Sequence, residues 1–323
     1  MLVVQKFGGS SLADGERLRR AARLCREALA RGDAVVMVVS AMGDTTDELE
    51  ALARELSPDP PPREMDALMT TGEQQSAALM AILLESLGTP ARSFTGWQAG
   101  LLTDTRHGDA RIRLLSPERL RRALAEGLTP VVSGYQGVSP AGEITALGRG
   151  GSDTTAVALA AALGAERCEI YTDVDGIYTA DPRLIPGARR MARIDYRDML
   201  RLAEAGSQVL HPRSVELALR NRVEIRLLSS FTAGEGSLVC ALRDEERPDF
   251  AGVTKSESDR ELCLVGRAAG ADTLSALVMK LADAGIQVMN GSVEDGSVTL
   301  RLAPTQLLPA LALAHEFMLE KGK

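Results

Sequence analysis

The sequence predicts a layered α/β domain with a largely parallel central sheet, followed by a small α+β module. Up to Phe231, apolar runs of strand length alternate with longer helical stretches, which is the pattern of parallel strands joined by helices. Residues 232–255 lack helix signals and are rich in glycine and charge, so we place a domain boundary within them. We therefore expect two domains, 1–235 and 250–323, each long enough to bury its own core.

Apolar runs such as AVVMVV at 34–39 indicate buried strands. In the first domain the expected strands are 2–5, 34–39, 130–135, 168–172 and 222–228, and the expected helices are 14–31, 45–56, 63–87 and 153–163. In the second domain the expected strands are 250–255, 261–266, 287–292 and 297–302, and the expected helices are 272–284 and 304–320.

Charge and cysteine content narrow the class of protein. The chain has 37 basic and 44 acidic residues, and its formal net charge of −7 disfavours nucleic acid or an anionic membrane as the main partner. No apolar run approaches the ~18 residues of a membrane span, and the N-terminus does not resemble a signal peptide. The four cysteines lie far apart, as buried thiols in a reducing cytosol do, so we expect a cytoplasmic protein.

Lysine is scarce, with 5 lysines among the 37 basic residues, and Lys6 is the only one in the first 254 residues. A general bias toward arginine explains the scarcity. Arginine does not replace lysine, however, where a compact ammonium must lie against a phosphate or a desolvated charge. Lys6 is therefore a candidate for a specific role.

Lys6 opens the first of three glycine-bearing segments at strand-to-helix junctions, where open α/β sheets bind ligands. In KFGGSS at 6–11, Gly8 and Gly9 let backbone amides approach a phosphate closely. The lysine precedes the glycines, unlike that of the P-loop, and a plain tight turn explains the segment equally well.

The second segment, LGRGGSDTT at 147–155, precedes and opens the expected helix. Arg149 can pair with a carboxylate through two parallel hydrogen bonds while the amides of Gly150 and Gly151 face an anion. The alternative is that Ser152 or Asp153 simply caps the helix, although a cap requires neither three glycines nor an arginine.

The third segment, YTDVDGIYTADPR at 171–183, follows a strand and is dense in aspartate, threonine and tyrosine. Its Asp175-Gly176 pair predicts a turn, and an ordinary hairpin is the alternative.

Taken together, six motifs resemble aspartate kinase, a member of the amino-acid-kinase superfamily. They are KFGGSS at 6–11, SAMGDTTDEL at 40–49, TTGE at 70–73, LGRGGSDTTA at 147–156, YTDVDGIYTADPR at 171–183 and VLHPRS at 209–214. The match covers about residues 2–231 and implies an amino-acid-kinase domain there. The strand-helix-strand-strand-helix order of the tail resembles an ACT-type, ferredoxin-like module.

The resemblance implies transfer of a phosphoryl group from ATP, with Mg²⁺, to the side-chain carboxylate of L-aspartate, the first step towards lysine, threonine and methionine. It implies catalytic roles for Lys6, Arg149 and Asp153, and no metal ligands beyond the Mg²⁺ carried by ATP. The implied ATP-binding residues are Lys6, Gly8, Gly9, Ser10, Thr172, Asp173, Tyr178, Asp181 and Arg183. The implied aspartate-binding residues are Ser40, Thr46, Glu73, Arg149, Gly150, Gly151, Ser152 and Asp153.

This chemistry needs no general base. A carboxylate with a pKa of about 4 is already ionised at neutral pH, so the site must mainly position the reactants and neutralise their negative charge. The absence of a catalytic histidine or cysteine pattern is consistent with this. We expect His211 to be structural, and neither His107 nor His315 has a partner pattern in the sequence.

The chain departs from the family's pattern at two places. Many relatives have a nucleotide-contacting lysine where this chain has Gln208, a loss that Arg183 and Mg²⁺ can offset. The family commonly ends in two ACT-type modules, whereas residues 250–323 have room for about one, and residues 266–272 lack the usual Asp-x-Pro-Gly effector loop. We expect this module to mediate homodimerisation with little feedback by lysine or threonine; the alternative is a working effector site with diverged loop residues.

Two other functions remain as alternatives. One is a non-catalytic regulatory subunit that binds amino acids, which the joint presence of Lys6, Arg149 and Asp153 disfavours. The other is a superfamily kinase that acts on another amino-acid carboxylate, which the RGGSDTTA segment disfavours.

Overall fold

The computed structural model describes residues 1–256, 258 and 260–322 of the 323-residue chain. The chain divides into unit 1, which comprises residues 1–175 and 220–235, and unit 2, which comprises residues 176–219 and 236–323. The chain passes from unit 1 to unit 2 for the last time between residues 235 and 236, at the start of the expected boundary region 235–250. Residues 176–219, however, belong to unit 2, so the units do not coincide with the two expected sequence ranges.

Six parallel strands form the central sheet of unit 1, in agreement with the predicted fold class. In spatial order they are β13 (Ile225–Ser229), β9 (Arg167–Thr172), β1 (Leu2–Phe7), β2 (Ala34–Val39), β6 (Thr129–Ser133) and β3 (Ala91–Phe94). The sequence predicts all of them except β3. That strand escapes prediction because its four residues, ARSF, form no apolar run.

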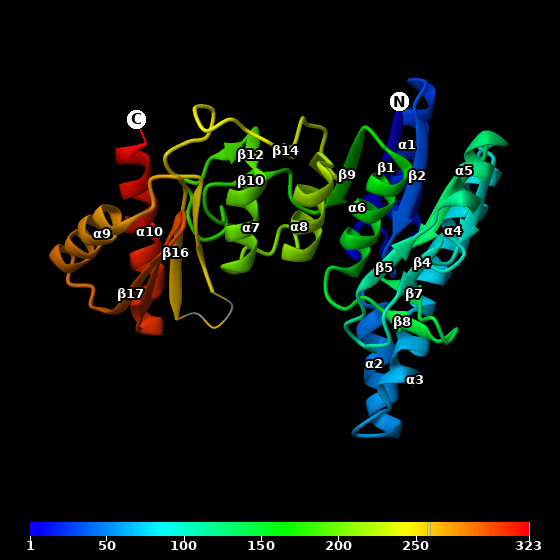
Figure 1. The fold of residues 1–323 in the computed structure, drawn as a ribbon, viewed down its shortest axis with the longest axis horizontal. Helices are drawn as coiled ribbons and strands as arrows, with labels where there is room; N and C mark the ends of the chain where they lie inside the picture. The colour runs from blue at the N-terminus through cyan, green and yellow to red at the C-terminus, as the bar shows by residue number, and fades with distance from the viewer. Residues whose placement is uncertain (257, 259, 323) are drawn as a thin grey trace. The chain divides into compact units, whose positions relative to one another are not determined.

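Helices cover both faces of this sheet. They are α1 (Gly15–Ala30), α2 (Thr45–Leu56), α3 (Pro62–Met69), α4 (Thr71–Ser86), α5 (Glu118–Ala125) and α6 (Gly151–Leu163). Helices α1 and α4 share a buried cluster with Val35, Met37 and Val39 of β2. Val36 and Val38 alternate with these residues and therefore face the other side of the sheet. In Figure 1, α4 and α6 lie on opposite sides of β1 and β2.

The expected helix 63–87 is wrong as a single element, because the chain forms α3 and α4 with a break at Thr70. The break lies where α4 approaches the loop after β2. A Cβ atom on Gly72 would come within 2.8 Å of the Ala41 Cβ, so only glycine allows this approach. In the first turn of α4, Glu73 accepts a hydrogen bond from the Ala41 amide, a tertiary contact that helical periodicity does not encode.

A second, smaller sheet in unit 1 has no counterpart in the sequence predictions. Its order is β5 (Ile112–Leu115), β4 (Leu101–Thr103), β7 (Gln136–Val138) and β8 (Ile144–Ala146). These strands have only three or four residues each, which is too short for an alternating pattern to be recognised. A short 3₁₀ turn, η1 (Gly9–Ser11), completes the unit.

Unit 2 begins with short elements and ends with the predicted α+β module. The first part contains β10 (Ile177–Tyr178), β11 (Arg190–Met191), β12 (Arg193–Asp195), α7 (Tyr196–Glu204), α8 (Pro212–Asn221), which continues past the unit boundary, and β14 (Ser237–Cys240). The module contains β15 (Gly252–Lys255), β16 (Glu261–Val265), α9 (Ala271–Asp283), β17 (Val288–Glu294), β18 (Ser297–Leu302) and α10 (Pro304–Lys321). Each element of the module agrees with the sequence prediction.

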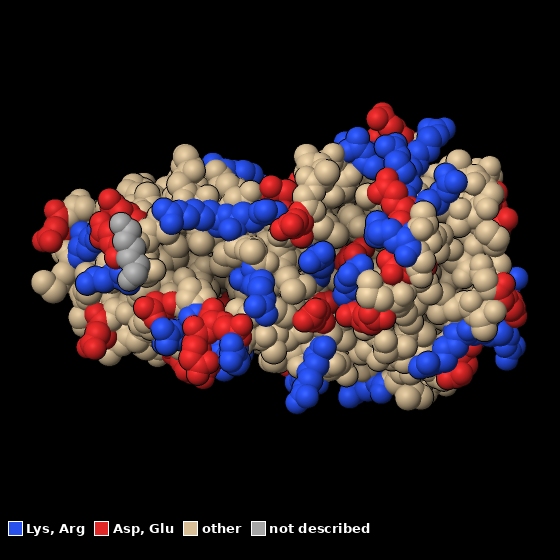
Figure 2. All heavy atoms as spheres, turned by 90° about the horizontal axis from the view of Figure 1, so that it is seen from above, with Lys and Arg blue, Asp and Glu red and all other residues tan. Residues whose placement is uncertain are grey.

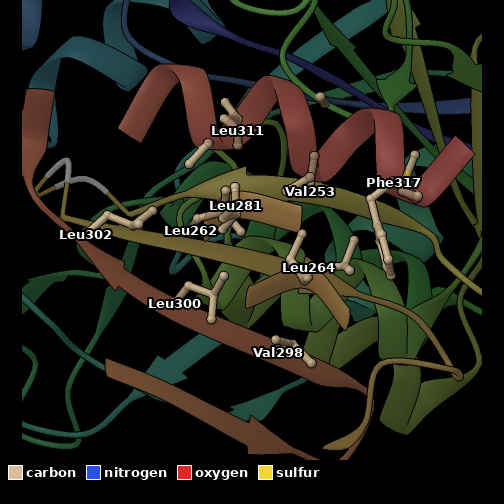
Figure 3. Packing of buried hydrophobic residues seen from close by; sticks show 14 of the residues in the cluster. Val253, Leu262, Leu264, Leu281, Val298, Leu300, Leu302, Leu311 and Phe317 are labelled. Carbon is tan, nitrogen blue, oxygen red and sulfur yellow. The ribbon is translucent and has the colours of Figure 1, made fainter. Parts of the chain in front are cut away.

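The four strands of the module form an antiparallel sheet in the order β15-β16-β18-β17. Alternate residues of β16, such as Leu262 and Leu264, point into the same buried cluster (Figure 3). Leu281 of α9 and Leu311 and Phe317 of α10 close this core from the helix side. The module therefore has a hydrophobic core, which its amphipathic pattern predicts.

Acidic and basic side chains are interspersed over the molecular face shown in Figure 2, as the near balance of 37 basic and 44 acidic residues suggests. Among the described helices, none combines the length and apolar character that crossing a membrane requires.

Candidate active site

Four parallel strands of unit 1 end at the same level of the sheet. Phe7 of β1 pairs in register with Val39 of β2 and with Tyr171 of β9, and Val39 pairs with Ser133 of β6. The segments that follow these strands therefore emerge along one edge. Ligands of open α/β sheets bind at the carboxyl ends of the strands. Two of the predicted glycine segments, 6–11 and 171–183, begin at the ends of β1 and β9.

Lys6 and Asp153 form an ion pair at this edge. The Lys6 Nζ atom lies 2.7 Å from the Asp153 Oδ1 atom, and their side chains are only 11% and 14% exposed. Lys6 belongs to β1, whereas Asp153 lies in the first turn of α6. The pair thus joins the first glycine segment to the second. A Cβ atom on Gly8 would lie 3.5 Å from the Lys6 ammonium, so the ammonium lies directly beside the glycine backbone.

The first glycine segment contains η1, a single 3₁₀ turn. The Gly8 amide donates to the Tyr171 carbonyl at 3.2 Å, so it is already engaged. The first amides of a 3₁₀ turn, here those of Gly9 and Ser10, have no intrahelical acceptor and are oriented for an anion. Gly9 is also required sterically, because a Cβ atom there would lie 2.9 Å from the Ala41 carbonyl oxygen.

The alternative for the second glycine segment, that Ser152 or Asp153 caps the helix, is wrong. Gly150, in the left-handed conformation with φ of 70°, is the N-cap of α6 and provides no side-chain cap. Ser152 and Asp153 instead lie within the first turn of the helix. Ser152 is nearly buried against Gly134, where a Cβ atom would come within 2.6 Å of the Ser152 Oγ atom. Arg149 is exposed and directly precedes Gly150, the N-cap of α6.

Glu73 is a buried carboxylate with one unused oxygen. Its Oε1 atom accepts a 3.2 Å hydrogen bond from the Ala41 amide, and its side chain is almost fully enclosed at 4% exposure for the residue. Its Oε2 atom is buried and has no hydrogen-bond partner among the described residues. Burial raises the pKa of Glu73 to about 7, against the opposing effect of the backbone hydrogen bonds. A cation placed at Oε2 would satisfy this oxygen.

The neighbouring candidates Ser40 and Thr46 are both partly buried. The Ser40 amide donates to the Phe7 carbonyl at 3.1 Å, which ties the loop after β2 to the end of β1. Thr46 lies in the first turn of α2. The loop after β2, which begins with Ser40, is thus held by hydrogen bonds to both the end of β1 and Glu73.

Tyr135 is a residue near this edge that sequence reasoning missed. It has a φ of 69°, which is unusual for a non-glycine residue. Its amide donates to Thr155 Oγ1 and its carbonyl accepts from the Leu147 amide, so it links the loop after β6 to the second glycine segment. Burial, as the larger cause, and the negative charge of Glu73, as the next, raise the pKa of Tyr135 to about 12. Its position after a buried strand and a glycine is the signal in the sequence that could have identified it.

The third predicted segment is divided between the units. Thr172 and Asp173 belong to unit 1, where the Thr172 hydroxyl donates to the Asp173 carboxylate at 3.0 Å. Tyr178, Asp181 and Arg183 belong to unit 2. The hairpin alternative is wrong, because β10, which follows the Asp175-Gly176 turn, pairs with β11 and not with β9.

Asp181 and Arg183 form a forked pair. The Arg183 Nη2 atom lies 2.7 Å from the Asp181 Oδ2 atom, and the Arg183 amide donates to Oδ1 at 2.9 Å. These hydrogen bonds, with the Arg183 side chain as the largest contribution, hold the pKa of Asp181 below its usual value. The Arg183 side chain is 79% exposed, so this guanidinium stands in solvent.

The histidines and cysteines form no cluster of catalytic type. Among the described residues, no group of three His, Cys, Asp or Glu side chains is placed to hold a metal ion. His107, which lacks a sequence pattern, has its Nδ1 atom 2.7 Å from the buried carboxylate of Asp66. The Arg213 amide donates to His211 Nδ1, in the turn that begins α8. Gln208 is exposed, and all four cysteines are free and buried.

A family model described as "Amino acid kinase family" matches residues 1–229. The aspartokinase of Mycolicibacterium smegmatis is 53% identical over 82% of this chain and 64% of its own length, and that of Corynebacterium efficiens is 48% identical over 93% and 73%. The chain thus spans between about two thirds and three quarters of these relatives' lengths. The crystal structure of E. coli aspartokinase III with aspartate and ADP superposes with a TM-score of 0.72 and 28% identity, covering 97% of this chain and 84% of that one. This chain belongs to the amino acid kinase family and, within it, to the aspartokinases.

Proposed function

We propose that this protein transfers the γ-phosphoryl group of ATP to the side-chain carboxylate of L-aspartate, forming 4-phospho-L-aspartate. The observation that carries the proposal is the enclosed Lys6–Asp153 pair between two glycine segments at the carboxyl edge of the sheet. Phosphoryl transfer to a carboxylate requires positioning and charge neutralisation rather than a general base. An enclosed ammonium beside backbone amides meets that need.

In this proposal Lys6 contacts the phosphate that is transferred, and Asp153 holds the Lys6 side chain in place. Two buried groups of opposite charge fix each other's position without leaving a net positive charge that would trap the product. The amides of Gly9 and Ser10 contact the same phosphate. Mg²⁺ enters with ATP, because this ion is usually bound through nucleotide phosphates and a few carboxylates rather than by a cage of protein ligands.

The aspartate pocket is proposed between the loop after β2, Glu73 and the start of α6. Arg149 pairs with a carboxylate of the substrate, and the amides of Gly150 and Gly151 and the side chain of Ser152 face the same anion. The unused oxygen of Glu73 receives the substrate's α-ammonium group, because a buried carboxylate oxygen without a partner is satisfied best by a cation. Ser40 and Thr46 line the remaining side.

The nucleotide is proposed to contact Thr172, Asp173, Tyr178, Asp181 and Arg183. The support from the structure is the exposed guanidinium of Arg183, which Asp181 holds by a fork of hydrogen bonds. With Gln208 in place of the lysine that many relatives have, Arg183 is the fixed positive charge that we assign to the phosphates in this segment.

For the C-terminal module we propose homodimerisation with weak feedback by lysine or threonine. The edge strand β17 exposes its residues, including Met289 at 68% and Val293 at 40%, as a strand that pairs with a second copy would. The loop between β16 and α9 is packed tightly, since a Cβ atom on Gly266 would lie 2.3 Å from the Asp249 carbonyl. Titration of lysine and threonine in the kinase assay tests this proposal; strong inhibition below 1 mM, on the order of a typical metabolite affinity, contradicts it.

We further propose that the enzyme works in the cytoplasm. Four buried free thiols are consistent with a reducing compartment.

The decisive experiment measures ATP consumption by the pure protein with aspartate, glutamate or N-acetylglutamate and traps the acyl phosphate with hydroxylamine. Aspartate-dependent hydroxamate supports the proposal. Hydroxamate with glutamate or N-acetylglutamate alone would identify a kinase for another carboxylate. ADP binding without turnover of any of the three would instead indicate a non-catalytic regulatory subunit.

A further inference from the structure

The loop that carries Asp181 and Arg183 is built into the C-terminal module. Ala180 and Ile185 are buried in the same hydrophobic cluster as Phe250, Leu311 and Phe317 of the module. Leu184 and Ala188 also pack against that cluster, where they are partly buried. One side of the segment 179–189 therefore forms part of the module's core, although its sequence belongs to the motif that we assign to the nucleotide.

Thr179 is the point at which the base of this loop is fixed. Its amide donates to the Arg189 carbonyl at 3.0 Å, and its hydroxyl accepts from the Arg189 amide at 2.9 Å, so the two ends of the loop are joined. The Thr179 carbonyl accepts from the Val253 amide of β15 at 2.8 Å. β15 approaches so closely that a Cβ atom on Gly252 would lie 3.0 Å from the Thr179 carbonyl oxygen.

Thr179 also contacts α10. Thr179 Oγ1 and His315 Nε2 share a hydrogen bond of 2.9 Å, and His315 is only 3% exposed. Burial, followed by the positive charge of Arg189, lowers the pKa of His315, so the imidazole is neutral at neutral pH. A neutral imidazole in an enclosed position with one defined partner is suited to fixing geometry.

Only one residue, Ala180, separates Thr179 at the base of the loop from Asp181 of the solvent-exposed fork. Asp181 follows Thr179 and the buried Ala180, and its carbonyl accepts from the amides of Leu184 and Ile185, which gives the loop a compact turn. A shift of Thr179 against α10 would therefore displace the Asp181–Arg183 fork directly. The buried side of the loop contacts the core of the module, whereas the Arg183 side chain of the fork is exposed to solvent.

We propose that His315 and Thr179 are positioning residues for the nucleotide: their hydrogen bond holds the Asp181–Arg183 fork in the arrangement that binds it. The inference rests on the proposed function, because it takes the fork to contact ATP. It makes a residue of the C-terminal helix part of the support of the nucleotide site. Loosening α10 therefore weakens nucleotide binding while leaving aspartate binding, which uses unit 1 residues, unchanged.

The test compares two pairs of variants in the full-length protein. Thr179→Val and His315→Leu remove the hydrogen bond and keep similar volume, whereas Thr179→Ser and His315→Gln retain a hydrogen-bonding group near the same position. We expect the KM for ATP and the Kd for ADP to rise roughly two- to tenfold in the first pair, the effect of one buried hydrogen bond. The second pair should stay within about twofold of the unmodified protein, and the KM for aspartate should not change in any of them.

Thr273→Val is the matched control for general loosening of the module. Thr273 is buried at the start of α9, and its hydroxyl donates to the Ala268 carbonyl at 2.7 Å, a hydrogen bond that involves no residue of the 179–189 loop. It should lower the unfolding midpoint without changing the KM for ATP. In the double variant Thr179→Val/His315→Leu, the change in the Kd for ADP should equal that of Thr179→Val alone, because Thr179→Val already removes the hydrogen bond through which His315 acts.

The outcomes separate this inference from the proposed function. An unchanged Kd for ADP in folded Thr179→Val and His315→Leu overturns the inference, and so does an equal rise in Thr273→Val. If the unmodified protein binds ADP but does not phosphorylate aspartate, the proposed function fails and the ADP titration still decides the inference. If it binds no ADP, both fail.

Discussion

The ammonium of Lys6 lies 2.7 Å from the carboxylate of Asp153, in a site where neither side chain is more than 14% exposed. Lys6 lies near the end of a strand and Asp153 in the first turn of a helix, so the pair connects two segments that are far apart in the sequence. An enclosed ion pair of this kind is weak evidence for stability, because desolvation offsets the attraction. It is better explained by a need to hold a positive charge at one place.

Lys6→Arg should therefore lose most of the turnover although the charge is preserved. The guanidinium is larger and planar, and it cannot occupy the space between Gly8 and Asp153 in the same way. We expect kcat to fall by about 100-fold or more, comparable to the loss of one preorganised donor to a developing charge. Steady-state kinetics at saturating ATP and aspartate provide the measurement. Lys280→Arg, at an exposed ion pair with Glu320, is the control and should keep normal turnover; near-normal turnover in Lys6→Arg would contradict the role.

Aspartate binding should weaken as the pH falls through about 7. The pKa of Glu73 is raised to about 7 by burial, so the carboxylate becomes neutral below that pH and loses its attraction for the substrate's ammonium. We expect the KM for aspartate to be about tenfold higher at pH 6 than at pH 8. Glu73→Gln should have a raised but nearly pH-independent KM. A wild-type KM that does not change over this range would exclude the contact.

Glu73 should also make the stability of the fold depend on pH, in the opposite direction to aspartate binding. Because the folded pKa of Glu73 is above the unfolded value of 4.5, the native state binds more protons between pH 4.5 and about 7, and its stability falls as the pH rises through that window. Glu73→Gln removes this loss. Relative to the unmodified protein, it should gain at most about 3 kcal/mol between pH 4.5 and 8. Urea unfolding at the two pH values measures the difference, and a gain at the acidic end instead would refute the assignment.

Arg149→Lys should weaken aspartate binding specifically. A lysine cannot form the two parallel hydrogen bonds that a guanidinium makes with a carboxylate. We expect the KM for aspartate to rise roughly tenfold, with the KM for ATP within about twofold of normal. Arg54→Lys, at an exposed i,i+4 pair with Glu50 on α2, is the matched control and should alter neither. An equal rise in both KM values would count against a role limited to aspartate.

Gly150→Ala and Gly164→Ala test whether the start of α6 is a binding site or only a helix terminus. Both glycines have left-handed φ angles, 70° and 68°, at the two ends of the same helix. Each variant should lose about 1 kcal/mol of unfolding free energy from backbone strain. Only Gly150→Ala should also raise the KM for aspartate. Equal kinetics in the two variants would show that the left-handed N-cap has no part in binding.

Local sequence signals predicted most of the elements. The five predicted strands of the parallel sheet and all elements of the C-terminal module have clear apolar patterns. The strands of the small sheet are too short to show one. The break at Thr70 was missed because it depends on how closely Gly72 approaches Ala41, a contact between segments that have no local signal for each other.

The candidate site was predicted in part for the same reason. Glycines and charged residues at strand-to-helix junctions are visible in the sequence, as is the lone Lys6. Tyr135 and His315 were not recognised, because their significance comes from partners that only the folded chain brings near them. His107 likewise gained a partner, Asp66, only in the structure.

By itself, the sequence determined the fold class, the family motifs and the types of residue that handle phosphate and carboxylate groups, because these depend on short patterns of polarity, glycine and charge. Only the tertiary structure decided which of them meet. In the folded chain Lys6 forms an ion pair with Asp153, burial raises the pKa of Glu73, and Thr179 is hydrogen-bonded to His315 of α10. Each of these depends on how distant segments pack, and a carboxylate or ammonium acquires its properties from the solvent and charges that such packing removes or brings close.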